Sequence, residues 1–305
     1  MKLQQLKYVR EIARRGFSIS AASNAMHTSQ PGVSNQVQLL EEELDLQIFK
    51  RHGKRLTGLT SFGQSVIKMA DRVLLDVENI RQLAADSKND QLGTLSIGTT
   101  HTQARYALPK AIKAFSQHYP HVHLNMVQGT PTEVAEMAAT GKVDIAIATE
   151  GLTQFDTLAI LPCYDWNRSL VVPPEHPLLS DNKLTLKAIA DYSLLTYAMG
   201  VTGRAQQDQA FIEQGLTPNV VFTATDADVI KTYVELGLGI GIIASMAFDS
   251  IKDAPLQALD VSHLFKPSTT QMGIRRGSYL RGFSYAFIEY LAPHLTRKVV
   301  EKAIA

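Results

Sequence analysis

The sequence predicts an α/β protein in three parts: a mostly helical head, a long linker helix and a larger domain of two α/β subdomains. Three observations support this fold class. The first 60 residues combine three short helical patterns with a basic hairpin pattern. Residues 61–86 contain no proline and keep an approximately heptad repeat of apolar residues. From Gly93 onward, short apolar strand patterns alternate with helical patterns, which is typical of α/β domains.

Composition excludes several classes of protein. The chain has 305 residues, of which 45% are hydrophobic and 19% charged, as in ordinary globular proteins of two or three domains. Cys163 is the single cysteine, so no intramolecular disulfide or cysteine-based metal site can form, and we expect it to be a small core residue. The sequence shows no secretory signal pattern and no apolar run long enough for a membrane span. We therefore expect a cytoplasmic protein that does not contact a membrane.

The head begins with three helical patterns. Apolar residues at helical spacing predict an amphipathic helix over residues 3–14. A second, short helix is expected after a serine cap at Ser18 or Ser20. A third begins with Ser29 as a hydroxyl cap and Pro31 in the first turn, where no amide hydrogen is needed. Two short helices joined by a tight turn are typical of a helix-turn-helix.

Polar and basic residues in this head predict contact with DNA. Amide and hydroxyl side chains near the start of the third helix can bond base edges and phosphates, although a helical subdomain with a polar face is the alternative. Residues 49–60 carry four Lys or Arg residues and no acid, and predict a hairpin with Gly53 at its tip. A basic hairpin beside a recognition helix is a wing, so we expect a winged helix-turn-helix. The predicted DNA-binding residues are Ser29, Gln30, Pro31, Ser34, Asn35, Gln36, Lys50, Arg51, Lys54 and Arg55.

The order of residues in the head resembles a known family. The runs SQPGVS at 29–34, LEEEL at 40–44 and IFKR at 48–51 are similar to the signature of LysR-type transcriptional regulators. The chain departs from that signature at Asp45, where the family usually has glycine, and at Asn35, where a basic residue is common. We expect Asp45 to strain or reshape its turn and Asn35 to change sequence preference.

The heptad pattern predicts a helix from Ser61, its expected N-cap, to about Asp86. We favour a coiled coil between two copies of the chain over packing within one copy. A dimer also fits palindromic DNA, because a two-fold axis places two heads on two half-sites.

Strand and helix patterns alternate through the remaining two-thirds, which predicts mostly parallel sheets covered on both faces. We expect two subdomains joined by crossovers near residues 161–167 and 265–271, as in periplasmic binding proteins, with a C-terminal helix returning to the first. The predicted boundaries are 1–60 for the DNA-binding domain, 61–91 for the linker helix and 92–305 for the effector-binding domain. Within the last, subdomain I comprises about 92–162 and 269–305, and subdomain II about 163–268.

A hydroxyl-rich segment, TTHTQ at 99–103, lies between a predicted strand and a predicted helix. Hydroxyls, an amide and free helix N–H groups suit a small oxyanion without a fixed positive charge, although a hydroxyl-rich helix cap is the alternative. Thr149 follows a buried strand and Thr202 precedes another helix, so these junctions are expected to face one crevice. Glu150 and Asp226 are interpreted as isolated acids.

Longer runs in this domain, including 99–109 and 222–233, are similar to the CysB/Cbl branch of the LysR family. The resemblance implies control of sulfur assimilation and cysteine biosynthesis genes, with sulfate or a small acylated serine (N-acetylserine or O-acetylserine) as effector. We expect self-association into dimers, as the heptad pattern indicates, and into tetramers, and we expect no cofactor and no metal. The residues that correspond to the effector site of that branch are Thr100, Thr102, Gln103, Thr149, Trp166 and Thr202.

Two other functions are alternatives to a ligand-responsive regulator. A solute-binding protein of periplasmic type for a small oxyanion would explain residues 93–305 but not the head. An α/β enzyme would need a nucleophile and base, and the sequence shows no Ser-His-Asp set. We therefore expect no enzymatic activity.

Overall fold

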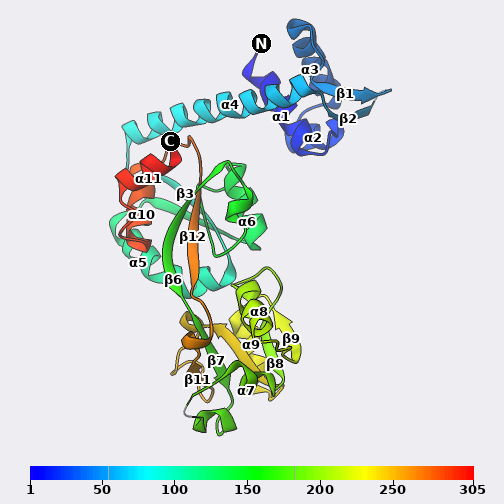
Figure 1. Cartoon of the computed structure of the whole chain (residues 1–305). Helices are drawn as coiled ribbons and strands as arrows, with labels where there is room; N and C mark the ends of the chain where they lie inside the picture. The colour runs from blue at the N-terminus through cyan, green and yellow to red at the C-terminus, as the bar shows by residue number, and fades with distance from the viewer. Residues whose placement is uncertain (54, 182) are drawn as a thin grey trace. The chain divides into compact units, whose positions relative to one another are not determined.

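The computed structural model describes residues 1–53, 55–181 and 183–305, which form two compact units, Met1–Ala85 and Asp86–Ala305 (Figure 1). Within the described residues, no helix combines the length and the apolar character needed to cross a bilayer.

The head has the predicted winged helix-turn-helix architecture. Ser18 caps the second helix by accepting a hydrogen bond from the Ala21 amide, and Ser29 caps the third by accepting one from the Gly32 amide. The third helix ends at Asp45, which adopts a left-handed φ of 52°, so the turn that usually holds glycine is strained here. The elements are α1 (Leu3–Arg14), α2 (Ile19–Ala25), α3 (Gln30–Leu44), β1 (Phe49–His52) and β2 (Arg55–Leu59).

The linker helix α4 spans Ser61–Lys88. The prediction that Ser61 caps it is wrong, because Ser61 is already helical and the Thr60 hydroxyl accepts the Gly63 amide hydrogen at 2.8 Å. Gly63 is required here, since a Cβ at this position would collide with the Ile48 carbonyl oxygen. The start of the helix therefore packs directly against the chain entering the wing.

The second unit contains two lobes, each built on a five-stranded sheet. In the first lobe the strand order is β4-β3-β5-β12-β6, with α5, α10 and α11 packing into one apolar cluster and α6 into another. Its strands are β3 (Gly93–Thr99), β4 (Val122–Gln128), β5 (Ile145–Ala148), β6 (Leu158–Trp166) and β12 (Ser268–Arg275). Its helices are the π-helical turn η1 (Gln103–Ala107), α5 (Leu108–His118), α6 (Pro131–Ala139), α10 (Gly282–Leu291) and α11 (Arg297–Ile304).

The second lobe has the strand order β11-β7-β10-β8-β9. Its strands are β7 (Arg168–Val172), β8 (Leu194–Tyr197), β9 (Val220–Ala224), β10 (Ile240–Ala244) and β11 (Gln257–Asp260). Its helices are α7 (Leu186–Ala190), α8 (Arg204–Glu213) and α9 (Ala227–Glu235).

The expectation of mostly parallel sheets is wrong, because both sheets are mixed. In the first lobe β12 runs antiparallel to β5 and β6, and in the second β7 runs antiparallel to β10 and β11. The chain leaves the first lobe along β6 and returns along β12, which lies beside it in Figure 1. Since the two strands carry the chain in opposite directions between the lobes, their pairing must be antiparallel.

Candidate functional site

The N-terminal half of α3 presents the polar face that was predicted to contact DNA. Val33 and Val37 are fully buried in the head, whereas Gln30, Pro31 and Asn35 are exposed. Of the remaining predicted residues on this segment, Ser29 is exposed and Ser34 and Gln36 are half-buried. The Ser29 hydroxyl also caps the helix, so only its second lone pair and its hydrogen are available to a ligand.

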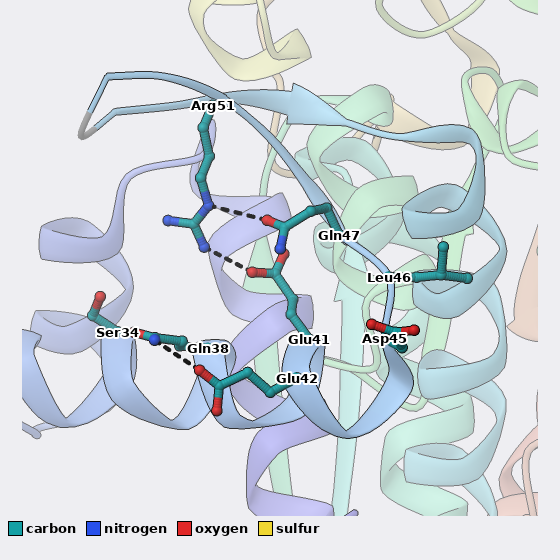
Figure 2. Close-up of a pocket in the computed structure, with 8 residues that line it drawn as sticks. All are labelled: Ser34, Gln38, Glu41, Glu42, Asp45, Leu46, Gln47 and Arg51. Atoms are coloured by element: carbon teal, nitrogen blue, oxygen red, sulfur yellow. Dashed lines mark hydrogen bonds and ion pairs between the residues drawn. The ribbon is translucent and has the colours of Figure 1, made fainter.

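The basic residues of the hairpin have different surroundings. The side chains of Lys50 and Arg55 are exposed and form no hydrogen bond or ion pair with the described part of the chain. Lys54 lies outside the described residues. Arg51 instead points from β1 toward α3, where its guanidinium donates to the Glu41 carboxylate at 2.8 Å and to Gln47 at 3.4 Å (Figure 2).

Glu41 connects the recognition helix with the wing. Its side chain is almost completely buried, and its Oε1 accepts hydrogen bonds from the Ile48 amide at 2.8 Å and the Phe49 amide at 3.1 Å. The binding patterns in the sequence did not point to this residue. The one available signal is an acid next to Leu40 on the inward face of the helix, where a charge must find partners.

In the second unit, residues of both lobes line a hollow of about 360 Å³. Thr100 and His101 line it from the first lobe, and Val201, Thr225 and Asp226 from the second. Nearby in the sequence, the Thr102 and Thr202 hydroxyls meet across the lobes at 3.4 Å, and both side chains are buried. The structure thus brings predicted residues from distant sequence positions to the junction of the lobes.

The other predicted effector residues have different partners. The Gln103 amide donates to the Thr270 hydroxyl at 3.1 Å and accepts from the Tyr164 hydroxyl, so it is held between β6 and β12. Thr149 follows β5 and is half-buried. Trp166 is buried in an apolar cluster of the second lobe, and its indole N–H forms no hydrogen bond within the described residues.

Two charged side chains meet the start of α8, although neither was predicted to act there. Arg168 is 2% exposed and donates to the Gly203 carbonyl at 2.7 Å and to Ser268 at 3.0 Å, and burial lowers its pKa. Glu150 accepts the Gly203 amide hydrogen, while its other carboxylate oxygen is buried and unpaired within the described residues. Burial raises the pKa of Glu150, against the opposing effect of this hydrogen bond and of Arg168.

These contacts correct one interpretation, because Glu150 is not isolated. A positive charge, which the predicted anion site did not require, also lies buried at the start of α8. The sequence signal for that charge was Arg168, which opens β7 ahead of the apolar run 170–172. Gly203 has a φ of 70°, and a Cβ there would collide with the Arg168 guanidinium, so this close approach requires glycine.

Two further residues have structural roles. Asp226 caps α9 by accepting the Val229 amide hydrogen at 2.9 Å, so it too is not isolated. Cys163 is buried in the first lobe, where burial raises the pKa of its thiol to about 12. The thiol is therefore protonated near neutral pH, and the prediction of a small core residue is confirmed.

Comparison with known proteins gives matches along the whole chain. Residues 3–64 match the model of the bacterial regulatory helix-turn-helix protein, LysR family, and residues 88–296 match that of the LysR substrate binding domain. The HTH-type transcriptional regulator SsuR of Burkholderia cenocepacia is 49% identical over 97% of this chain and 96% of its own. The regulator CysB of Haemophilus influenzae is 49% identical over 99% of this chain and 94% of its own. The crystal structure of the cofactor-binding domain of the Cbl transcriptional regulator is 43% identical, with a TM-score of 0.69, over 71% of this chain and 95% of that one.

Proposed function

The chain belongs to the LysR family of bacterial transcriptional regulators, and from this premise we propose that it regulates sulfur assimilation and cysteine biosynthesis genes in response to a small anion. The observation that carries the proposal is its 49% identity to SsuR and CysB over nearly the full length of each chain. The solute-binding alternative is not favoured, because it leaves the helix-turn-helix match unexplained. Since promoter DNA lies in the bacterial cytoplasm, the protein acts there.

For the DNA, we propose that the exposed residues of α3 contact bases and phosphates and that the basic wing contacts the backbone or minor groove. The support is geometric: Gln30 and Asn35 are exposed amides near the start of the helix, and Lys50 and Arg55 are cations without partners in the described chain. The boundaries proposed for the three parts are residues 1–60, 61–91 and 92–305.

For the effector, we propose sulfate or an acylated serine in the crevice between the lobes. The buried hydroxyls of Thr100, Thr102 and Thr202 supply donors, and the positive charge of Arg168 lies beneath the first turn of α8. An anion bound to hydroxyls of both lobes favours the closed arrangement, and only such a difference in affinity can shift a conformational equilibrium.

For self-association, we propose a dimer formed through α4, with pairing of dimers into tetramers. The apolar residues Val66, Met69, Val73, Ile80 and Leu83 follow a heptad spacing along this helix, and the last four are exposed in the single chain. An exposed apolar stripe with this repeat is the surface that a two-stranded coiled coil buries.

Footprinting on DNA upstream of sulfur assimilation genes tests the proposal, with sulfate, N-acetylserine and O-acetylserine as separate probes. We expect specific protection whose length changes with at least one probe. Thr100→Val removes a buried hydroxyl but keeps the side chain's shape, and should weaken probe binding by tenfold or more while leaving operator binding intact. Protection that no probe alters would refute the effector assignment, and absence of specific protection would refute the gene assignment.

A further inference from the structure

Tyr106 of the first lobe is inserted into the second. It lies on the π-helical turn η1, four residues after Thr102, and π-helical turns are often found at functional sites. Its ring packs against an apolar cluster of the second lobe that includes Ala227 and Ile230. Its hydroxyl donates to the Asp228 carboxylate at 2.6 Å and accepts from the Lys231 ammonium at 3.3 Å.

Charges on both lobes strengthen this contact. Arg105, next to Tyr106, pairs with Asp228 at 2.6 Å, and the buried Lys231 is held by Asp253 at 2.8 Å. Burial alone would raise the pKa of Asp228, but the Tyr106 hydrogen bond and the charges of Lys231 and Arg105 outweigh it and lower the pKa. Asp228 is therefore ionised at neutral pH, and hydrogen bonds to an ionised acceptor are among the stronger ones.

The Thr102–Thr202 and Glu150–Gly203 hydrogen bonds also link the lobes across the crevice. The chain itself connects them only where β6 passes into β7 and where the return segment enters β12. Because the chain joins the lobes at these two places, non-covalent contacts determine how far apart the lobes lie. A hydrogen-bonded, charged contact between them therefore stabilises the closed arrangement.

We propose that Tyr106 and Asp228 form an inter-lobe clamp that sets how tightly the crevice closes, with Arg105 and Lys231 as supporting charges. They are positioning residues, because none belongs to the proposed effector set. The expectation that this clamp slows release of the effector rests on the proposed function. The closing of the lobes itself does not depend on any ligand.

Hydrogen exchange on the ligand-free full chain tests the clamp directly. The Gly203 amide of the second lobe is hydrogen-bonded to Glu150 of the first, so opening of the crevice exposes it to water. Tyr106→Phe should speed its exchange by about tenfold, and Asp228→Ala by at least as much because it also removes the ion pairs to Arg105 and Lys231. The two effects should not add in the double variant, because both single variants remove the Tyr106–Asp228 hydrogen bond. Asp249→Asn is the matched control, since Asp249 is bonded within the second lobe, to the Ile251 and Lys252 amides and to Lys252.

Binding and release of the probe N-acetylserine can be measured in the same variants by stopped-flow fluorescence of Trp166, the single tryptophan. The clamp variants should release the probe about tenfold faster without slower association, because an open crevice still admits ligand. Unchanged exchange at Gly203 in both single variants, or effects that add in the double variant, would overturn the clamp. Normal probe binding by Thr100→Val would instead overturn the effector site while leaving the exchange result to stand.

Discussion

The Glu41 carboxylate and the Arg51 guanidinium lie 2.8 Å apart and join the last turn of α3 to the first strand of the wing (Figure 2). Glu41 also accepts two backbone amide hydrogens at the entry to that strand. Arg51 is thus part of the framework that holds the wing against the recognition helix, even though about a third of its side chain remains exposed and available to a phosphate.

Arg51→Ala should therefore loosen the wing as well as weaken DNA binding. The variant leaves the buried Glu41 carboxylate with only its two amide donors, at a cost of about 1–3 kcal/mol to the head. Hydrogen exchange at the Ile48 and Phe49 amides without DNA should accelerate, and Lys50→Ala provides the matched control on the same strand. Identical exchange in Arg51→Ala and the control would mean that Arg51 serves DNA alone.

Lys50→Ala and Arg55→Ala should act on DNA affinity only. Each exposed cation that contacts a phosphate contributes about one unit to the slope of log affinity against log salt. We expect the slope to become shallower by about that amount in each variant, for operator and unrelated DNA alike. A slope equal to that of the unmodified protein in the double variant would place the wing away from the DNA backbone.

Glu150 should make anion binding depend on pH. Since its pKa is raised on folding, the folded protein holds a proton at pH values where the unfolded chain has lost it, so the free energy of unfolding falls as pH rises through that interval. A bound anion disfavours the ionised carboxylate further, so sulfate affinity should also fall as pH rises through the raised pKa of Glu150. Glu150→Gln retains an acceptor for Gly203 and removes the charge.

Calorimetry with sulfate distinguishes the outcomes for Glu150. We expect tighter binding by Glu150→Gln near neutral pH and a flatter pH profile than in the unmodified protein. Parallel profiles for the two proteins would show that another group controls the pH dependence.

Ile80→Glu should disrupt self-association. Ile80 is 65% exposed on the apolar stripe of α4, and a carboxylate there would have to be buried at the coiled-coil seam. We expect a lower molecular mass in light scattering and loss of cooperative binding to two half-sites. Lys68→Glu, an exposed position off the stripe, should leave the mass unchanged. An unaltered mass for Ile80→Glu would place the dimer contact elsewhere.

The sequence alone determined the features that depend on neighbouring residues. Helical spacing and the Ser29 and Pro31 start signals fixed the helices of the head, and the basic run around Gly53 fixed the hairpin. The threonine-rich junctions identified the segments that meet between the lobes. A hydroxyl residue that precedes a helix is a signal for the start of that helix, and this signal can be recognised from neighbouring residues alone.

Tertiary structure decided the features that depend on which distant segments meet. The antiparallel pairing of β12 with β6 follows from the return of the chain between lobes, which strand patterns do not encode. Which distant segments meet also decides the placements of Glu41, Glu150 and Arg168. In the sequence, each of them is an ordinary charged residue. Burying a charge is costly without partners, and those partners come from other segments of the fold, so only the folded chain shows what these residues hold together.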